Sequence, residues 1–187
     1  IEGLRALEAA TDIITYEFEN IPADALDTIA AHVLPPVNAL RISGDRLTEK
    51  TFIREQGLPV ADFVDLDSLE ALERGLDMFG GTGIVKTRRF GYDGKGQWRI
   101  DTNTNWQQSS AEMLAQPAIL ERIIPFGREL SIVIARGVDG QTACYPPIEN
   151  MHENHILRRS IMPATLDTSQ ADAAQHIGET LVARLEY

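Results

Sequence analysis

The sequence predicts an α+β fold in which helices and β-hairpins are interleaved without a regular βαβ repeat. Some segments carry apolar residues every three or four positions and others have a period of two, and glycine or proline separates them. The composition is that of an ordinary globular protein, with 43% hydrophobic and 24% charged residues. Its 187 residues are enough for one sizeable core or two small ones.

A strand and a helix are predicted before the first break in the pattern. Residues 13–19 alternate in polarity with a period of two, which indicates a strand. Pro22 then begins a helix that extends to about His32. The Leu-Pro-Pro sequence at residues 34–36 interrupts the pattern, so we expect a domain boundary there, after residues 1–35.

Two further helices are predicted after this break, with a short strand between them. Ser43 is predicted to cap a helix that ends at about Gln56, because a Gly-x-Pro sequence follows. A strand over residues 61–66 leads to the second helix, for which Asp67 is the predicted cap. Leucines and Phe79 recur along that helix at helical spacing and indicate a stripe that faces the core.

The second half of the chain is predicted to be rich in strands. The runs with strand character are residues 83–87, 97–100, 118–124, 128–136 and 141–145. A glycine-rich connection joins the first two, and a Val-Asp-Gly turn at residues 138–140 leads into the last. A final helix begins near Ser169 and carries apolar residues at intervals of four.

Charge distribution indicates the kind of ligand to expect. The formal net charge is -11, which opposes nonspecific attraction to nucleic acid, because phosphate-backbone binding depends on clustered lysine and arginine. Residues 86–99 nevertheless contain five basic residues and one acid, so this window carries +4. We therefore expect a small anionic ligand at the window and no nucleic-acid partner.

Cysteine content and hydropathy bear on the compartment. Cys144 is the single cysteine, so no internal disulfide can form, and we expect a cytoplasmic protein. No apolar run approaches the roughly 20 residues that span a bilayer, and no membrane partner is expected. The chain begins with Ile1 and its last helical pattern runs into Tyr187 without a stop, so we expect a piece of a longer protein.

The strongest functional signal is the glycine-rich connection. Residues 86–98 read KTRRFGYDGKGQW, with three glycines among cations, and backbone N–H groups of such a loop can fold over a polyphosphate. The loop is not a Walker A motif, because its Gly-Lys-Gly lies between two strands, and residues 81–86 lack the third glycine of a dinucleotide fingerprint. A flexible hairpin is the alternative. The glycines, five cations and the strand-borne Lys86 together favour phosphate binding.

Four glutamates are candidate functional residues. Glu17 and Glu19 share one face of the predicted strand, about 7 Å apart, near the end where α/β folds form ligand crevices. By themselves, these two glutamates are better explained as solvent-facing acids on an edge strand, which are common in so acidic a chain. Glu121 and Glu129 lie in strands otherwise rich in isoleucine and leucine, so each needs a partner, which can be a ribose hydroxyl, a cation or a protein group.

Two histidines were considered as metal ligands. His152 and His155 are three residues apart, but no cysteine or further clustered histidine completes a zinc set, so we expect no zinc site. His152 can hydrogen-bond a nucleotide, and an ordinary surface histidine fits the sequence as well.

Five short segments occur in order along the chain. They are TYEFENIP at residues 15–22, DRLTEK at 45–50, IVK at 84–86, GYDGKGQW at 91–98 and ILR at 156–158. Together they resemble the carboxyaminoimidazole ribonucleotide synthetases, a family of ATP-grasp enzymes in purine biosynthesis. The resemblance runs almost from end to end, and the Tyr-Asp-Gly-basic-Gly-Gln stretch is fairly specific to this family among ATP-grasp enzymes.

The resemblance implies a domain organisation. It implies an ATP-grasp fold, in which ATP lies between two α+β subdomains and a glycine-rich hairpin closes over its phosphates. Residues 1–35 would be the tail of a preceding Rossmann-like domain. Residues 36–187 would be the ATP-grasp domain, incomplete at its C-terminal end, with the Mg²⁺ ligands beyond Tyr187 and none within the chain.

The resemblance also implies a set of nucleotide-binding residues. They are Arg46, Lys86, Gly91, Tyr92, Asp93, Gly94, Lys95, Gly96, Gln97, Glu121, Arg122, Ile123, Ile124, Glu129 and His152. Arg46 and Lys86 would contact the phosphates. Residues 91–97 would form the lid, residues 121–124 would line the adenine pocket, and Glu129 would hold the ribose hydroxyls.

The implied reaction needs a second set of residues. Glu17, Tyr92 and Lys95 match catalytic positions near bicarbonate and aminoimidazole ribonucleotide, although the family often has arginine in place of Lys95. ATP and Mg²⁺ would serve to phosphorylate bicarbonate, and the amine of aminoimidazole ribonucleotide would take up the carboxyl group. A homodimer is also implied.

Two alternatives stay open on the sequence. One is another ATP-grasp ligase, such as a formate-using glycinamide ribonucleotide transformylase or a biotin carboxylase, which would share the nucleotide site but not Glu17, Tyr92 and Lys95 in their acceptor roles. The other is a non-catalytic nucleotide-binding module.

Overall fold

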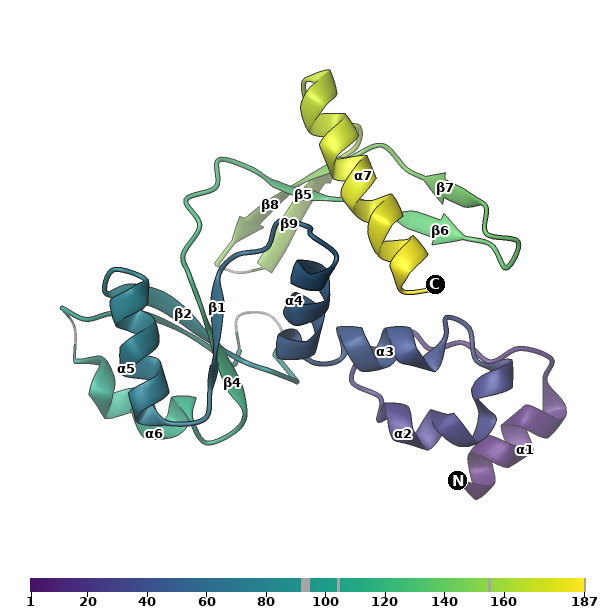
Figure 1. Ribbon diagram of the computed structural model, residues 1–187. Coiled ribbons are helices and arrows are strands. Elements are labelled where there is room, and N and C mark those ends of the chain that lie inside the picture. Colours follow the sequence, from purple (N-terminus) through teal and green to yellow (C-terminus); the bar gives the residue numbers. More distant parts are fainter. Residues whose placement is uncertain (92–94, 104, 155, 187) are drawn as a thin grey trace. The chain divides into compact units, whose positions relative to one another are not determined.

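The computed structural model describes residues 1–91, 95–103, 105–154 and 156–186. These residues divide into two compact units, which are described separately. The first unit consists of Ile1–Gly44, Arg128–Met151 and Leu157–Tyr187, and the second of Asp45–Gly127 and His152–Ile156. Helices and antiparallel strands are mixed along the chain, which confirms the predicted α+β class (Figure 1).

A four-stranded sheet is the centre of the second unit. Its strands, in order across the sheet, are β1 (Phe63–Leu66), β4 (Ala118–Glu121), β2 (Thr82–Thr87) and β3 (Gln97–Asp101). All neighbouring pairs are antiparallel. The register places Lys86 opposite Gln97 on one side and Ile119 on the other. The predicted strands are confirmed here, although β4 ends earlier than the sequence pattern indicated, at Glu121.

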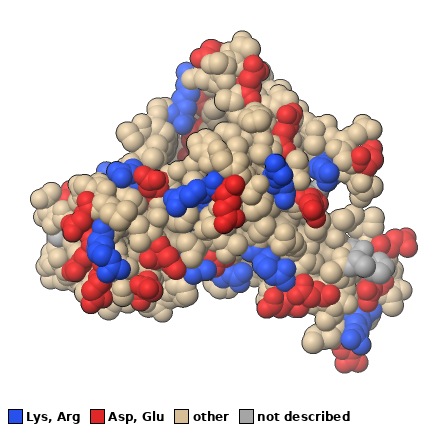
Figure 2. All heavy atoms as spheres, in the orientation of Figure 1, with Lys and Arg blue, Asp and Glu red and all other residues tan. Residues whose placement is uncertain are grey.

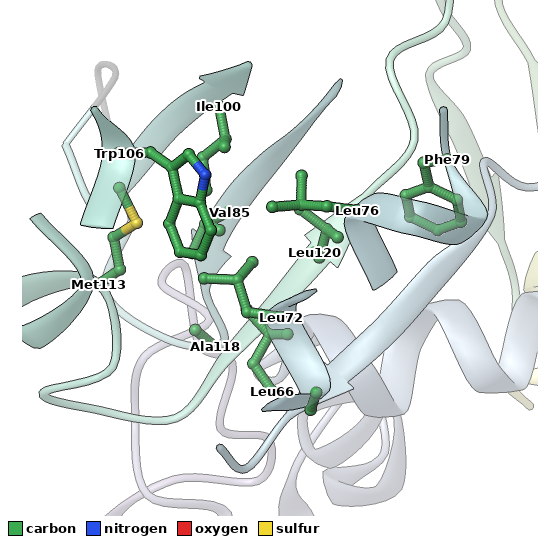
Figure 3. Packing of buried hydrophobic residues seen from close by; sticks show 11 residues of the cluster. Leu66, Leu72, Leu76, Phe79, Val85, Ile100, Trp106, Met113, Ala118 and Leu120 are labelled. Carbon is green, nitrogen blue, oxygen red and sulfur yellow. The ribbon is translucent and has the colours of Figure 1, made fainter. Parts of the chain in front are cut away.

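One face of this sheet packs into an apolar core (Figure 3). Helix α5 (Leu69–Met78), the 3-10 turn η2 (Trp106–Ser109) and helix α6 (Ser110–Met113) supply the helical part of that core. Leu72 and Leu76 are 0% and 1% exposed, as the helical spacing predicted. From the sheet, Val85 and Leu120 point into the same cluster, because alternate residues of a strand share a face.

Helix α4 (Arg46–Glu55) covers the opposite face of the sheet. Arg46, Lys50 and Arg54 are four residues apart and therefore lie along one side of the helix. The guanidinium of Arg54 lies 4.0 Å from the ring centroid of Phe63 on β1. Lys50 reaches Glu121 at the end of β4.

Two predicted helix caps are wrong by one or two residues. Asp45, and not Ser43, caps α4, because its carboxylate accepts hydrogen bonds from the backbone N–H groups of Leu47 and Thr48. Ser43 is instead the last residue of the preceding helix α3 (Val37–Ser43). A carboxylate at the N-cap also complements the helix dipole, which a serine does not.

The cap of α5 shows the same kind of shift. The hydroxyl of Ser68 accepts a hydrogen bond from the Ala71 N–H, so Ser68 is the N-cap. The predicted cap, Asp67, accepts a hydrogen bond from the Ser68 hydroxyl. Adjacent Asp and Ser are both good caps, and only the backbone path decides between them.

The first unit opens with short helices around a second apolar cluster. They are α1 (Glu2–Ala10), α2 (Ala23–Leu26), η1 (Asp27–His32) and α3. The predicted helix after Pro22 is therefore present as α2 and η1, with a kink at Ile29. The predicted strand over residues 13–19 is wrong. Among the described residues it is reduced to one isolated parallel bridge between Ile14 and Val33, and a strand requires a continuing ladder.

The remainder of the first unit contains two further sheets and a long helix. A three-stranded sheet has the order β5 (Glu129–Ser131), β8 (Ile148–Glu153), β9 (Ile156–Ile161). The predicted strand over residues 128–136 is broken into β5 and β6 (Ile134–Arg136), and β6 pairs with β7 (Thr142–Cys144) across the predicted turn. Helix α7 (Thr168–Arg184) begins with a capping box between Asp167 and Gln170.

The surface is mixed in charge. On the face that Figure 2 shows, lysine and arginine side chains are interspersed with aspartate and glutamate. In the part of the chain that the structure describes, no helix combines the length and the apolar character needed to cross a membrane.

Candidate functional site

The end of strand β2 brings several predicted site residues together. The Nε of Arg46 donates a hydrogen bond to the carbonyl of Thr87, at 3.1 Å. The N–H of Thr87 in turn donates to the carbonyl of Gly96, at 2.8 Å. A Cβ added at Gly91 would lie 3.1 Å from the guanidinium of Arg46 and 3.3 Å from the hydroxyl of Thr87. Arg46, Gly91 and Gly96 therefore meet around Thr87, directly beside Lys86.

Thr87 was missed by the sequence analysis. It is 2% exposed, and its hydroxyl lies where a Cβ of Gly96 would come within 2.5 Å. Gly96 also has a φ of +67°, which L-residues with a side chain rarely adopt. The glycine hairpin is thus seated on Thr87, and both features require glycine at position 96. A threonine after a strand-borne lysine carries no distinctive sequence signal.

Lys86 is half of a buried ion pair. Its Nζ donates a hydrogen bond to Oε2 of Glu121, at 2.9 Å. Glu121 is only 6% exposed, so the predicted need for a partner is met by a cation. The register confirms that both side chains project from the α4 face of the sheet, since Glu121 lies opposite Ile84, two residues from Lys86.

A second lysine, which the sequence analysis missed, lies on the other side of Glu121. The Nζ of Lys50 is 3.3 Å from Oε1 of Glu121. This distance satisfies an ion pair, but Oε1 accepts no aligned hydrogen bond from the described residues. Two lysines therefore pair with one buried carboxylate, and Arg46, on the same helix as Lys50, adds a third cation at the Thr87 carbonyl. The excess positive charge suits a small anion.

Arg88, another cation of the basic window, serves the fold. Its Nε donates to both carboxylate oxygens of Asp45, at 3.0 and 3.1 Å. Burial by itself raises the pKa of Asp45, but the hydrogen bonds from Arg88 and from the Thr48 N–H outweigh it and hold this pKa below its ordinary value of 3.8. Asp45 thereby ties the start of α4 to the segment after β2.

The segment after β4 borders a pocket of about 350 Å³. Its lining residues are Pro59, Val60, Ala61, Asp62, Arg122 and Ile124. The side chain of Arg122 is committed to the protein, because its Nε donates to Asp62 at 3.0 Å and its Nη2 to the Met78 carbonyl at 3.3 Å. The backbone N–H of Arg122 also donates a hydrogen bond to the Asp62 carbonyl. Of the predicted adenine-pocket residues 121–124, Arg122 and Ile124 therefore line this pocket.

Other predicted residues lie on the hairpin. Gln97 opens β3 opposite Lys86, and Lys95 is exposed in the turn before it. Tyr92, Asp93 and Gly94 lie outside the described residues.

The predicted residues of the first unit and of strand β8 are spread over separate elements. Glu129 opens β5 opposite Asn150 and is exposed. Glu17 is exposed in the irregular segment after the Ile14 bridge, so the strand face that was expected to align it with Glu19 is not formed. His152 is exposed on β8, and His155 lies outside the described residues. No three His, Cys, Asp or Glu side chains among the described residues gather in a way that could hold a metal ion.

The fold and the site define a class of protein. A glycine-rich hairpin, a strand lysine paired with a buried glutamate, and an arginine at the start of a helix lie together on an antiparallel sheet. This is the arrangement of an α+β domain that binds a phosphorylated ligand.

The chain belongs to the ATP-grasp family, whose domain model matches residues 51–187. This confirms the predicted ATP-grasp fold. The chain is 44% identical to the N5-carboxyaminoimidazole ribonucleotide synthase of Brucella melitensis. The match covers all of this chain and 52% of that relative. The chain is 37% identical over the same shares to the synthase named alike in Pseudomonas aeruginosa.

A solved structure gives the same result. A crystal structure of the ADP complex of an N5-carboxyaminoimidazole ribonucleotide synthetase has a TM-score of 0.92 and 32% identity, and the match covers 99% of this chain and 50% of that one. The chain thus spans about half the length of the relatives that it matches.

Proposed function

We propose that the intact protein is an ATP-dependent ligase of de novo purine biosynthesis that carboxylates the amine of 5-aminoimidazole ribonucleotide, with bicarbonate as the carbon source. The observation that carries the proposal is the Lys86–Glu121 pair beside the glycine hairpin, in a chain 44% identical to a synthase named for the carboxylated product. A relative of the same name has been crystallised with ADP.

The chemistry explains why the site contains cations and no nucleophile of its own. An oxygen of bicarbonate attacks the γ-phosphorus of ATP, ADP leaves, and carboxyphosphate forms. The amine then attacks the carboxyl carbon, phosphate leaves and the nitrogen loses a proton, which gives a carbamate. In phosphoryl transfer of this kind the protein contributes mainly positioning and charge neutralisation.

Each part of the site has a proposed role toward ATP. Lys86 and Arg46 contact the phosphates, because both are anchored at the root of the hairpin. Residues 91–97 close over the phosphates and shield a labile acyl phosphate from water. The adenine lies against residues 121–124, next to the pocket of the second unit. Glu129 accepts hydrogen bonds from the ribose, and His152 also contacts the nucleotide.

The acceptor site and the metal are proposed for the intact protein. Glu17, Tyr92 and Lys95 act near bicarbonate and the aminoimidazole amine, where a carboxylate can orient the amine and an ammonium can steady negative charge on the carboxyl group. By the family resemblance, we place the Mg²⁺ ligands of the intact protein outside residues 1–187.

The remaining assignments rest on the family resemblance and on composition. Residues 1–35 are proposed as the tail of a Rossmann-like domain and residues 36–187 as part of the ATP-grasp domain. A homodimer is proposed by analogy, and a cytoplasmic location on the strength of the single cysteine.

Release of ADP by the intact protein tests the proposal. We expect ADP release in the presence of ATP, Mg²⁺ and bicarbonate to be stimulated by aminoimidazole ribonucleotide. Stimulation by glycinamide ribonucleotide with formate, or by biotin, would identify another ATP-grasp ligase. Binding of ATP without any acceptor-stimulated turnover would identify a non-catalytic module.

A further inference from the structure

We propose that Lys50 is a positioning residue, which neutralises the buried carboxylate of Glu121 and so leaves Lys86 available to the phosphates of a bound nucleotide. The inference rests on the proposed function, since it assumes that Lys86 binds phosphate. It assigns to Lys50 a part in nucleotide binding that neither sequence pattern nor family resemblance indicated.

The contacts of Lys50 indicate that its ammonium does not bind the ligand directly. Its ammonium is 3.3 Å from Oε1 of Glu121 and 5.9 Å from the ring centroid of Phe63. The side chain is 15% exposed, less than the 23% of Lys86. The ammonium is therefore held between a carboxylate and an aromatic face, and it acts on the ligand through Glu121.

Glu121 requires this second cation for an electrostatic reason. Both of its oxygens are shielded from water, and Oε1 has no aligned hydrogen-bond donor among the described residues. While Lys86 is its partner, the charge is compensated. When Lys86 turns toward phosphate, the carboxylate stands beside the negative charge of the nucleotide. Without Lys50 it would then be a buried, uncompensated anion, which is costly.

Three basic residues of α4 lie on one side of the helix and make different contacts. Arg46, Lys50 and Arg54 follow one another at intervals of four on the side that faces the sheet. Arg46 binds the Thr87 carbonyl and Arg54 stacks on Phe63, so Lys50 is the member of the row that reaches the carboxylate. Arg54 therefore provides a matched control, because it carries the same charge on the same helix face and, among the described residues, the ion pairs of Glu121 are made by Lys50 and Lys86.

The test is a double-mutant cycle on the intact protein, with the dissociation constant for ATP and Mg²⁺ measured by calorimetry. We expect Lys50→Met to weaken ATP binding about thirtyfold or more, the cost of removing one partner of a buried charge pair. Lys50→Arg should stay within about threefold of wild type, because the charge is kept. The control Arg54→Met should stay within about twofold. In a Glu121→Gln background, Lys50→Met should cost less than about threefold, because no buried anion is left to compensate.

Each outcome decides the inference. An equal loss from Lys50→Met with Glu121 and with Gln at position 121 would mean that Lys50 acts directly on the nucleotide or only on the fold, and the inference is then wrong while the proposed function stands. Wild-type protein that does not bind ATP would overturn both. If Lys50→Met alone does not fold, the comparison of Glu121→Gln with the double variant decides, because neither of them contains the buried carboxylate that Lys50 is proposed to neutralise. Near-equal ATP affinities of Glu121→Gln and the double variant support the inference, and a tenfold difference between them overturns it.

Discussion

At the scale of single residues, the proposed nucleotide-binding role of Lys86 depends on an ammonium that is already paired with Glu121. The ammonium is paired with Glu121 at 2.9 Å, so a phosphate must share it or displace the carboxylate. A hydrogen bond from this ammonium to phosphate is charge-assisted, as the bond to the carboxylate already is, so the exchange replaces one strong hydrogen bond with another. The free energy of nucleotide binding at this site is therefore a difference between two ion pairs.

Removing the side chain of Lys86 should weaken ATP binding by the intact protein. For Lys86→Ala we expect a loss of about tenfold to a hundredfold in affinity, the range for one hydrogen bond that involves charged groups. Calorimetric titration with ATP and Mg²⁺ provides the measurement. Arg99→Ala is the control, since it removes the same charge from the basic window at an exposed position of β3. Equal affinities of Lys86→Ala and wild type would contradict the assignment.

Asp45 should make the stability of the protein depend on pH. Its folded-state pKa is lowered, so the carboxylate stabilises the fold fully above its ordinary value of 3.8, and this contribution is lost as the pH falls through the lower folded value. Asp45→Asn keeps a capping side chain but removes the charge that binds Arg88. We expect it to lower the free energy of unfolding at neutral pH by about 1 to 2 kcal/mol.

Urea unfolding across a pH series measures this effect. The gap between wild type and Asp45→Asn should narrow as the pH is lowered below 3.8, because the wild-type carboxylate is then protonated as well. Asp24→Asn, at a side chain that is 94% exposed, should change stability little at any pH. A gap that stays constant with pH would show that the charge of Asp45 contributes nothing.

Sequence analysis predicted Lys86 and Glu121 separately but not as a pair. Each was singled out by its own strand, and the link between them is the β2–β4 pairing of residues 35 positions apart. Lys50 was missed for the same reason, since the segment DRLTEK reads as an ordinary helix start. Long-range register decides which charges meet, and single-sequence periodicity does not contain it.

At the scale of elements, the glycine hairpin is held in place by its contact with Thr87. Gly96 has a φ of +67°, and its carbonyl accepts a hydrogen bond from the Thr87 N–H. These two features fix the backbone direction in which strand β3 begins. Strand and turn signals were sufficient to predict β2 and β3, because turn glycines between two apolar runs are strong local signals. The same local reasoning failed at residues 13–19, where alternation was present but no ladder formed. Strands β8 and β9 were missed because their sequence shows no clean alternation.

Gly96→Ala should destabilise the hairpin more than a comparable glycine substitution. Gly80, just after α5, has a φ of +77° with nothing within 4 Å of an added Cβ, so Gly80→Ala meets backbone strain alone and should cost about 1 kcal/mol. Gly96→Ala adds a contact of 2.5 Å with the buried Thr87 hydroxyl and should cost at least about 2 kcal/mol. Urea unfolding of both variants gives the comparison. ATP affinity should fall in Gly96→Ala only, and equal losses of stability would mean that Thr87 yields without cost.

At the scale of the whole molecule, the ATP-grasp assignment and the acceptor assignment have different foundations. The proposed nucleotide-binding residues Arg46, Lys86 and Gly91 lie in one unit, and the family match covers that unit from residue 51 onward. Glu17 belongs to the first unit and Lys95 to the second, so the family resemblance is what relates them. The fold class could be predicted because helical and strand periodicity and short motifs indicate it. The nucleotide site stays a prediction, and so does the acceptor site, whose proposed residues come from distant segments and need a functional test.

Substitution of Glu17 separates carboxylation of aminoimidazole ribonucleotide from ATP use in general. Glu17→Gln preserves size and removes the charge that is proposed to orient the amine or accept its proton. In the intact protein we expect ATP affinity near that of wild type, because the proposed phosphate contacts come from Lys86 and Arg46. Release of ADP stimulated by aminoimidazole ribonucleotide should fall by about a hundredfold or more, the usual contribution of a general base.

Glu19→Gln is the matched control, two residues away on the same exposed segment, and should retain stimulated ADP release. If both variants lose ATP affinity together, the segment supports the fold and Glu17 has no acceptor role. Full stimulation in Glu17→Gln would likewise remove it from the reaction, while the nucleotide site would stand on its own evidence.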